Sequence, residues 1–455
     1  MPSSARCLPP EGPPRGLRIP ALSLLIACGL ATCGNDGEKA PVDATPIDAV
    51  STAGWVSQLG GNDIDLGHGV AVDPNGNVYA VGETSSTELA GIEGSGASDG
   101  FVVKQRLDGK VAWTRLLGTA EPDTITGIAV DSAGNACITG STGGELASTF
   151  CRGASDAFLA RLTPDGNTEW ISVISSLGEE TSMAVAIDQQ GSCYATGLTN
   201  GAVGDGTSAG QGDAFVAKYS AKGEPVWVHM LASESGDMGS AIALDAAGNV
   251  YVAGYTGGVL DGTSNAGSFD LFVAKYAPDG TQGWVWQFGG TGEEYPNGLV
   301  VDSQAGALYL TGYTLSSLDG KTSQGDKDAF LIKLGIDGTK QWTEQFGTSK
   351  KDTSFGIDLD AGGAIVICGR TEGTLAGEGN KGLIDYFVAR YQANGERAWI
   401  VQDGSEAVDT CWDLAVGPGG RIHLVGYTNG VLGEQNAGAF DAFVRKLEQN
   451  VGNNG

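Results

Sequence analysis

Hydrophobic and polar residues alternate along most of this chain in short segments, and the segments recur with a fixed period. Each period opens on a tryptophan, and the interval is 57 or 58 residues: Trp55, Trp113, Trp170, Trp227, Trp284, Trp342 and Trp399. The tryptophan begins one short segment, and three more follow it, exemplified by 127–131, 249–256 and 213–219. Turns rich in Gly, Asp and Asn separate the segments. Alternation over short runs between such turns predicts β-strands, four in each period.

Seven tandem copies of a four-stranded unit predict an all-β chain that folds as a closed seven-bladed β-propeller over 55–447. The last copy ends at Leu447 without a fourth strand, whereas Trp55–Leu59 has no repeat of its own. The N-terminal strand is therefore predicted to complete the seventh blade and to leave no exposed sheet edge. Residues 448–455 are expected to form a disordered tail. The repeat Trp and an invariant Phe of the third strand are expected to fill the core between blades. That Phe stands at Phe101, Phe158, Phe215, Phe272, Phe330, Phe387 and Phe443.

The first 54 residues have the pattern of an export signal and a linker. Basic residues precede an apolar run from Ile19 to about Thr32, which is too short to span a membrane. Within it, 25–28 (LIAC) resembles a bacterial lipobox, which implies cleavage before Cys28 and acylation of its thiol; Cys33 is the alternative position. An ordinary secretory signal with incidental cysteines is the other interpretation. We therefore expect a lipoprotein signal peptide at 1–27 and a flexible tether at 28–54. The protein is then exported and lipid-anchored at a bacterial outer membrane or cell surface.

The chain is strongly acidic, with a formal net charge of −28 and an isoelectric point near 4.3. Such a surface repels phosphate backbones, so nucleic acid is not an expected partner. The lipid anchor, and a glycan or protein ligand, are the expected partners of a monomer. Five cysteines follow the predicted tether, so at least one has no partner within a monomer, and the sequence leaves the pairing open. They are Cys137, Cys151, Cys193, Cys368 and Cys411.

At 127–135 (GIAVDSAGN), 249–256 (NVYVAGYT) and 213–219 (DAFVAKY), the chain resembles the bacterial SBBP β-propeller repeat family. The resemblance covers roughly 55–447, and it implies a propeller on exported, often surface-associated proteins without implying a defined reaction. The seventh copy departs from the motif, because Gly417 replaces the turn Asp and 421–423 (RIH) replaces NVY. We expect a weaker turn there and an unchanged strand pattern.

Acidic residues recur ten positions after each repeat Trp, and we call them the ring acids: Asp65, Asp123, Glu180, Asp237, Glu294, Asp352 and Asp409. A second acidic series begins the third strand: Asp99, Asp156, Asp213, Asp270, Asp328, Asp385 and Asp441. Both are expected on one face of the propeller, near the central channel. A repeated acid near a repeated Thr typically caps a loop. The alternative is a ring that binds a ligand or a divalent cation such as Ca²⁺.

The repeat symmetry breaks three residues after each ring acid, where the seven copies carry seven different residue types: His68, Thr126, Met183, Ser240, Asn297, Phe355 and Trp412. Closure of the ring would bring His68, Phe355 and Trp412 into neighbouring blades, and Asp358 replaces a small residue in the same sector. These four residues form the candidate ligand site, suited to a sugar or a cationic group. A loosely constrained position is the competing interpretation.

The sequence carries no P-loop or HExxH motif, and its three histidines fall in different repeats. We therefore expect a binding or scaffold module for a glycan, a cation or a protein partner, and not an enzyme. The alternatives are a surface polysaccharide hydrolase or lyase using carboxylates at the channel mouth, and a rigid spacer without a ligand.

Overall fold

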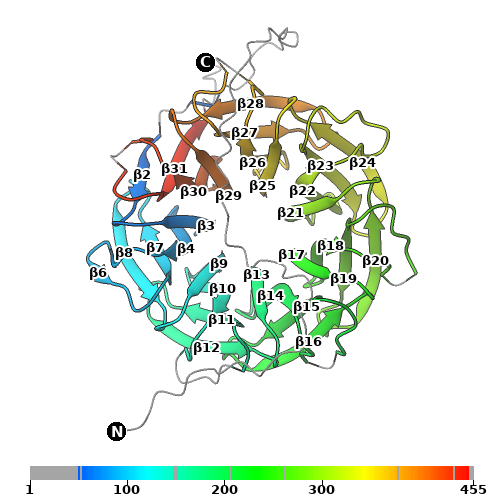
Figure 1. Cartoon of the computed structure of the whole chain (residues 1–455), viewed down its shortest axis with the longest axis horizontal. Helices are drawn as coiled ribbons and strands as arrows, with labels where there is room; N and C mark the ends of the chain where they lie inside the picture. The colour runs from blue at the N-terminus through cyan, green and yellow to red at the C-terminus, as the bar shows by residue number, and fades with distance from the viewer. Residues whose placement is uncertain are drawn as a thin grey trace, which may run out of the picture.

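The computed structural model describes residues 50–51, 54–146, 152–204, 206–260, 262–376, 379–433 and 436–449. The predicted signal peptide, Cys28, Cys33 and Cys151 lie outside these residues. The described chain is all-β, with seven four-stranded sheets arranged around a central axis (Figure 1). An Asp-x-x-Gly-Asn turn connects the first and second strands in three of the blades: at 73–77 the Asp73 carboxylate accepts the backbone N–H groups of Asn75 and Asn77, and Gly76 has a φ of 80°. Only glycine adopts that conformation without strain. The predicted seven-bladed propeller is confirmed.

The strands of each blade run outward from the channel in sequence order. The first three blades contain β3 (Asp65–Val72), β4 (Val78–Thr84), β7 (Asp99–Gln105) and β8 (Val111–Leu117); β9 (Asp123–Val130), β10 (Ala136–Thr142), β11 (Asp156–Leu162) and β12 (Thr168–Ile174); and β13 (Glu180–Ile187), β14 (Cys193–Thr199), β15 (Asp213–Tyr219) and β16 (Pro225–Leu231). A small hairpin of β5 (Glu88–Leu89) and β6 (Ile92–Glu93) projects from blade 1.

The next three blades contain β17 (Asp237–Leu244), β18 (Val250–Thr256), β19 (Asp270–Tyr276) and β20 (Gln282–Phe288); β21 (Glu294–Asp302), β22 (Ala307–Thr314), β23 (Asp328–Gly335) and β24 (Lys340–Phe346); and β25 (Asp352–Leu359), β26 (Ile365–Thr371), β27 (Asp385–Tyr391) and β28 (Arg397–Asp403). Blade 7 contains β29 (Asp409–Gly417), β30 (Arg421–Thr428), β31 (Asp441–Gln449) and β2 (Val56–Leu59). The replacement of the turn Asp by Gly417 thus leaves both flanking strands in place.

The N-terminal strand closes the ring, as the repeat phase predicted. β2 pairs antiparallel with β31, with Val56 opposite Arg445 and Leu59 opposite Ala442. The pairing continues past the predicted boundaries, since β1 (Val50–Ser51) pairs with Glu448 and Gln449 at the end of β31. The sequence analysis placed β1 in the tether and the end of β31 in the tail, and both are instead part of the sheet. The edge of β31 beyond Arg445 is free to form further backbone hydrogen bonds, and β1 supplies the partner.

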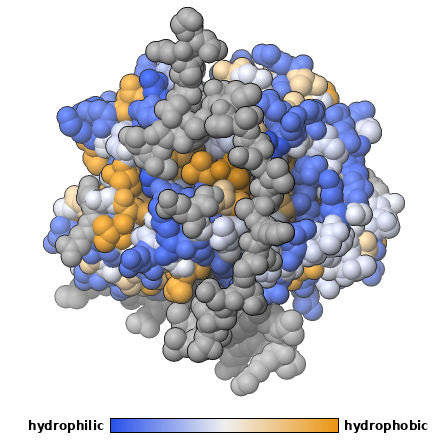
Figure 2. Space-filling model, turned by 90° about the horizontal axis from the view of Figure 1, so that it is seen from above, coloured by the Kyte–Doolittle hydropathy of each residue, from blue (hydrophilic) through white to orange (hydrophobic). Residues whose placement is uncertain are grey.

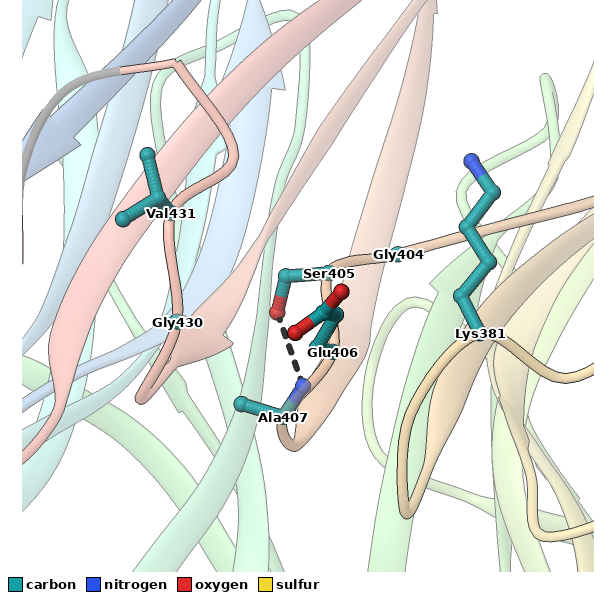
Figure 3. Close-up of a pocket in the computed structure, with 7 residues that line it drawn as sticks. All are labelled: Lys381, Gly404, Ser405, Glu406, Ala407, Gly430 and Val431. Carbon is teal, nitrogen blue, oxygen red and sulfur yellow. Dashed lines mark hydrogen bonds between the residues drawn. The ribbon is translucent and has the colours of Figure 1, made fainter.

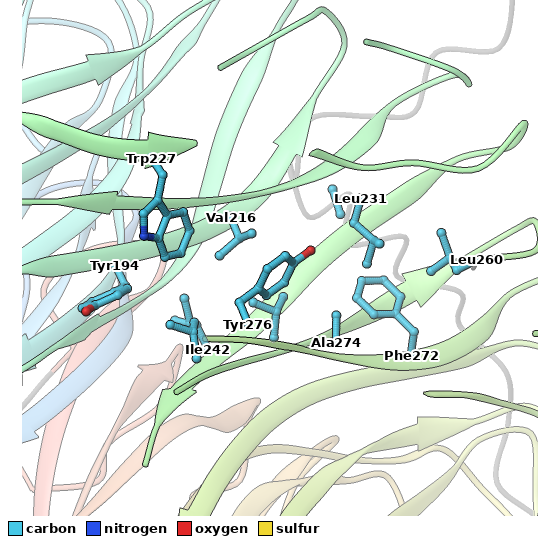
Figure 4. Packing of buried hydrophobic residues seen from close by; sticks show 12 residues of the cluster. Tyr194, Val216, Trp227, Leu231, Ile242, Leu260, Phe272, Ala274 and Tyr276 are labelled. Atoms are coloured by element: carbon cyan, nitrogen blue, oxygen red, sulfur yellow. The ribbon is translucent and has the colours of Figure 1, made fainter. Parts of the chain in front are cut away.

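The core lies between the blades. The third-strand Phe is buried in all seven blades, and Phe272, for example, lies in a core cluster with Leu260, Tyr194 and Tyr276 (Figure 4). The prediction is confirmed for Phe but only partly for Trp, whose ring is half-exposed on the outermost strand in all copies except Trp227. Figure 2 shows the corresponding edge of the disc as mainly hydrophilic, with patches of hydrophobic residues.

Six of the seven outer Trp residues instead bond to a turn of the next blade. The Trp113 indole N–H and the Lys104 ammonium both donate to the carbonyl of Pro164, each at 3.0 Å. Lys104 also lies 4.6 Å over the Tyr79 ring of its own blade. Gly166 completes this turn with a φ of 78°, and a Cβ there would meet the Trp113 ring at 2.9 Å. The same indole contact recurs at Trp55–Leu107, Trp170–Ala221, Trp227–Pro278, Trp284–Ile336 and Trp342–Ala393. The periodic Trp, Gly and basic residues thus fasten one blade to the next.

Two disulfides also connect neighbouring blades. Cys137 of blade 2 pairs with Cys193 of blade 3, and Cys368 of blade 6 pairs with Cys411 of blade 7, each with 6.0 Å between the Cα atoms. The pairing that the sequence left open is settled for these four cysteines. In the part of the chain that the structure describes, no helix has the length and apolarity needed to cross a membrane.

Candidate functional site

The ring acids are buried and hydrogen-bonded within their own blades. Asp352, for example, accepts the backbone N–H of Thr348 at 2.6 Å and the hydroxyl of the same residue at 2.9 Å. All seven accept the N–H four residues earlier: Gly61–Asp65, Thr119–Asp123, Ser176–Glu180, Ser233–Asp237, Gly290–Glu294, Thr348–Asp352 and Ser405–Asp409. Burial raises the pKa of Asp65, Asp123, Glu180, Asp237, Asp352 and Asp409. This geometry is that of a loop cap.

The second acidic series fastens another loop in the same way. Asp328 accepts the backbone N–H of Gln324 at 2.7 Å and the side-chain amide of Gln345 at 2.8 Å. Its charge is close enough to raise the pKa of Asp352, after the larger effect of burial. Among the described residues, no three His, Cys, Asp or Glu side chains are grouped so that they could hold a metal ion. The hydrogen bonds of both acidic series therefore favour a structural role, and the described residues provide no group of three side chains that could bind Ca²⁺.

The symmetry-breaking residue is the extra residue of a β-bulge in every inner strand. In blade 1, Gly67 pairs with Gly82 and Gly69 pairs with Val81, which leaves His68 out of the ladder. The same register shift occurs in the other six inner strands, which approach the central axis in Figure 1. A bulge turns its extra side chain away from the regular pleat, and bulges are frequent beside functional sites. The position varies because the ladder does not constrain it.

Polar residues at the bulge bind the next blade. His68 contacts the carbonyl of Ile125 at 3.2 Å through Nδ1, Thr126 donates to the carbonyl of Ser182 at 2.7 Å, and Asn297 donates to that of Ser354 at 2.8 Å. Phe355 has no polar side-chain group for this contact, and Met183 has no N–H or O–H donor either. Three of the seven bulge residues thus contact the next blade through a polar side-chain group.

Three of the four candidate residues come together, as the sequence analysis predicted. The rings of Phe355 and Trp412 are stacked, with centroids 4.5 Å apart and an interplanar angle of 16°. The His68 ring lies 5.9 Å from Trp412, and the Arg370 guanidinium lies 5.7 Å from the Phe355 ring centre. The Phe355, Trp412 and His68 side chains are half-buried. Blades 6, 7 and 1 thus present one aromatic cluster at the start of their inner strands.

Asp358, the fourth candidate, is engaged with backbone. One of its oxygens accepts the N–H of Val416 in blade 7 at 2.7 Å, and the other accepts that of Leu359 at 2.7 Å. Asp413 repeats the arrangement one blade later, because it accepts the N–H groups of Val70 in blade 1 and of Leu414. Burial raises the pKa of Asp358 to about 6 and that of Asp413 to about 7. These carboxylates fasten blades 6, 7 and 1 inside the channel.

Asp413 was not among the residues predicted from the sequence, although its position carried a signal. Every other copy carries a small residue at this position: Gly69, Gly127, Ala184, Ala241, Gly298 and Gly356. The same comparison that identified Asp358 would have found it.

The remaining histidines lie elsewhere. His229 stacks on Trp227 in an outer strand, with ring centroids 5.2 Å apart. His423 is buried, and burial lowers its pKa to about 4, with a smaller effect from Lys446. His68, His229 and His423 therefore do not share a site.

A shallow surface depression of about 660 Å³ opens beside blades 6 and 7 (Figure 3). It is lined by Lys381, Gly404, Ser405, Glu406, Ala407, Gly430 and Val431. Lys381 is paired with Asp403 at 2.5 Å, and Ser405 caps Asp409 through both its N–H and its hydroxyl. Lys381 and Ser405, two of the polar residues that line the depression, thus already bond to neighbouring protein groups.

Comparison with known proteins agrees with the fold. Residues 54–90, 112–147 and 226–261 match the SBBP family, described as a β-propeller repeat. The chain is 25% identical over 418 residues to the regulatory protein FlaEY of Caulobacter vibrioides, which covers 85% of this chain and 39% of that protein. It is 20% identical over 498 residues to the uncharacterized WD repeat-containing protein L264 of Acanthamoeba polyphaga mimivirus, with 82% and 36% covered. The chain thus spans less than half the length of both relatives.

Among solved structures, the WD40 domain of Neurospora crassa Pan2 aligns with a TM-score of 0.48 at 10% identity, covering 89% of this chain and 97% of that domain. Three repeats match a family model directly, and all seven blades share one architecture. The described chain is a β-propeller built from seven repeated blades, and three of its repeats match the SBBP model.

Proposed function

We propose that this chain is an exported, lipid-anchored propeller that acts as a binding or scaffold module, with its ligand at the aromatic cluster of blades 6, 7 and 1. One observation carries the proposal: Phe355 and Trp412 stack at bulge positions where the other copies hold His, Thr, Met, Ser or Asn. Aromatic faces that are only half-buried at the mouth of a channel suit a sugar ring or a cationic group. A protein surface is the third ligand class.

Two features support export. Four of the cysteines form disulfides between blades, and such bonds persist in oxidising compartments outside the cytoplasm. The second feature is the N-terminal pattern at 1–27, which is typical of a lipoprotein export signal. Its acylation site is Cys28, with Cys33 as the alternative. Mass spectrometry of the mature N-terminus tests it: a diacylated or triacylated Cys28 is expected, and an unmodified terminus well beyond Cys33 would overturn the anchor.

A binding role is favoured over the alternative of a polysaccharide hydrolase or lyase. Such an enzyme needs a carboxylate pair whose oxygens are free to contact the substrate. The ring acids, in contrast, are buried caps, and both oxygens of Asp358 and of Asp413 accept backbone N–H groups. We therefore assign these acids to stability and the aromatic cluster to recognition.

The experiment is a screen of neutral glycans and of cationic ligands with the wild-type chain and a Phe355→Ala/Trp412→Ala variant. Met183→Ala is the matched control, because Met183 occupies the same bulge position in blade 3. We expect a ligand that binds wild type and the control and binds the double variant at least tenfold more weakly. Equal binding by a folded double variant would place the site elsewhere, and turnover of a bound glycan by wild type would support the enzymatic alternative.

A further inference from the structure

Aromatic residues gather on one half of the ring, next to the cluster already described. Tyr255 meets Tyr295 edge to face at 4.8 Å, and Tyr295 stacks on Tyr313 at 5.1 Å, which leads from blade 4 to blade 5. The equivalents of Tyr295 in blades 1 to 3 are Leu66, Thr124 and Thr181, and those of Tyr313 are Glu83, Ser141 and Leu198. Since three blades fold without these rings, the blade architecture does not require them.

Two cations lie between the aromatic groups. The Lys327 ammonium is 4.2 Å from the centre of the Tyr313 ring, and the Arg370 guanidinium is over the Phe355 ring in the next blade. Both side chains are half-buried, and their equivalents in blades 1 to 3 carry no positive charge: Ser98, Ser155 and Gly212 for Lys327, and Glu83, Ser141 and Leu198 for Arg370. In blades 5 and 6, each of these cations therefore lies over an aromatic ring.

These cations are not neutralised by a direct partner. Among the described residues, neither Lys327 nor Arg370 forms an ion pair or a hydrogen bond through its side chain, although the chain has 54 acidic residues. Burial lowers the pKa of Lys327, and the neighbouring charges of Arg370 and Lys351 lower it further. The nearby acids are partly occupied, because Glu293 accepts the Tyr295 hydroxyl at 3.0 Å and Glu372 lies 4.0 Å from Lys351. The cations repel each other, and an anion placed between them would relieve that repulsion.

We propose that these residues bind an acidic carbohydrate, a uronate-containing oligosaccharide, with the sugar carboxylate between Lys327 and Arg370. The mouth patch comprises Tyr295, Tyr313, Lys327, Phe355, Arg370 and Trp412. Arg370 offers a planar fork that matches a carboxylate, and the aromatic faces on both sides take the apolar faces of the sugar rings. The inference rests on the proposed binding function and narrows its ligand to an anionic glycan. A phosphate-bearing or peptide anion would use the cations but not the rings.

The test measures binding to the full chain by calorimetry with EDTA present, so that a bridging divalent cation plays no part. The probes are oligogalacturonate, its methyl ester, a neutral cello-oligosaccharide and a pentaglutamate peptide. We expect oligogalacturonate to bind at least tenfold more tightly than the other three. Lys327→Gln/Arg370→Gln should weaken this binding at least tenfold. Arg106→Gln/Lys110→Gln, which removes two exposed cations from blade 1, should leave it unchanged.

The outcomes separate the two proposals. No binding of oligogalacturonate, or equal binding by the two double variants, would overturn the acidic-glycan inference. Equal binding of pentaglutamate would also overturn it, because the patch would then recognise charge alone. If a neutral glycan binds wild type and depends on Trp412, the proposed function stands while this inference fails. If no probe in either screen binds wild type, both fail.

Discussion

Trp412 stacks on Phe355 across the boundary between blades 7 and 6, with ring centroids 4.5 Å apart and planes inclined by 16°. Both residues sit outside the sheet ladder, on bulges of the inner strands β29 and β25. A bulge that carries Thr or Asn is tied to the next blade by a hydrogen bond, whereas this pair exposes ring surface instead. The relationship marks the sector where the repeat departs most from its own pattern.

Closure of the ring should control cooperative unfolding. Deletion of 55–60 removes β2 and its pairing with β31, together with the Trp55 contact to blade 1. We expect this variant to lose its single sharp thermal transition, because β31 becomes an open edge. Deletion of 36–48 ends before Val50 and leaves both paired segments, so it serves as the control. Calorimetry that gives the same transition for both deletions would contradict the role of β2.

The two disulfides should each stabilise the propeller. They span 56 and 43 residues, and loop closure of that length is worth up to about 4 kcal/mol. We expect Cys137→Ala/Cys193→Ala to lower the free energy of unfolding by about 2 to 4 kcal/mol, and reductant to lower the wild-type melting temperature. A variant lacking all four cysteines should melt at the same temperature with or without reductant. Non-reducing peptide mapping checks the pairing, and a cross-link through Cys151 would count against it.

Stability should fall as pH rises through the range where Asp358 and Asp413 ionise. Their folded-state pKa values, about 6 and about 7, lie above the ordinary value of 3.8. A carboxyl group whose pKa is higher in the folded state stabilises the fold fully at a pH below its pKa in the unfolded chain. That stabilisation is lost as the pH rises through its pKa in the folded state. A tenfold change in proton affinity corresponds to about 1.4 kcal/mol, so we expect a loss of at least about 2 kcal/mol between about pH 5 and about pH 8.

Asp358→Asn/Asp413→Asn removes both titrations while keeping the side-chain shape. Denaturant melts across this pH range should give a flatter profile for the variant than for wild type. The ring acids whose pKa values are also raised supply the slope that persists. Identical slopes for variant and wild type would show that the pair does not titrate in this range.

The ring acids should behave as caps and not as cation ligands. Asp352→Ala leaves the partly buried N–H and hydroxyl of Thr348 without their acceptor, which we expect to cost about 1 to 3 kcal/mol of unfolding free energy. Asp326→Ala, at an exposed position in the same blade-to-blade region, should cost less than about 0.5 kcal/mol. Added Ca²⁺ should not change the melting temperature of wild type. A rise with Ca²⁺ that Asp352→Ala abolishes would support a cation at the ring instead.

The architecture was predictable from sequence because the same local strand pattern recurs in seven copies, and each copy supports the same prediction. Seven spaced Trp residues and seven alternating strand sets define the blade, and the incomplete last copy requires Trp55–Leu59 to close it. The grouping of His68, Phe355 and Trp412 followed from the same periodicity, since closure makes the first and last blades neighbours.

Tertiary structure decided what each side chain does at its position. Sequence spacing places the Asp65 series at the start of each inner strand but does not reveal that loop N–H groups donate to those carboxylates, because the partners are set by backbone direction. The pairing of Cys137 with Cys193 depends on the distance between adjacent sheets. The juxtaposition of Lys327 with Arg370 joins strand ends from two blades, 43 residues apart in the chain. Periodicity determines which strands form, whereas the packing of one blade on the next determines which side chains meet.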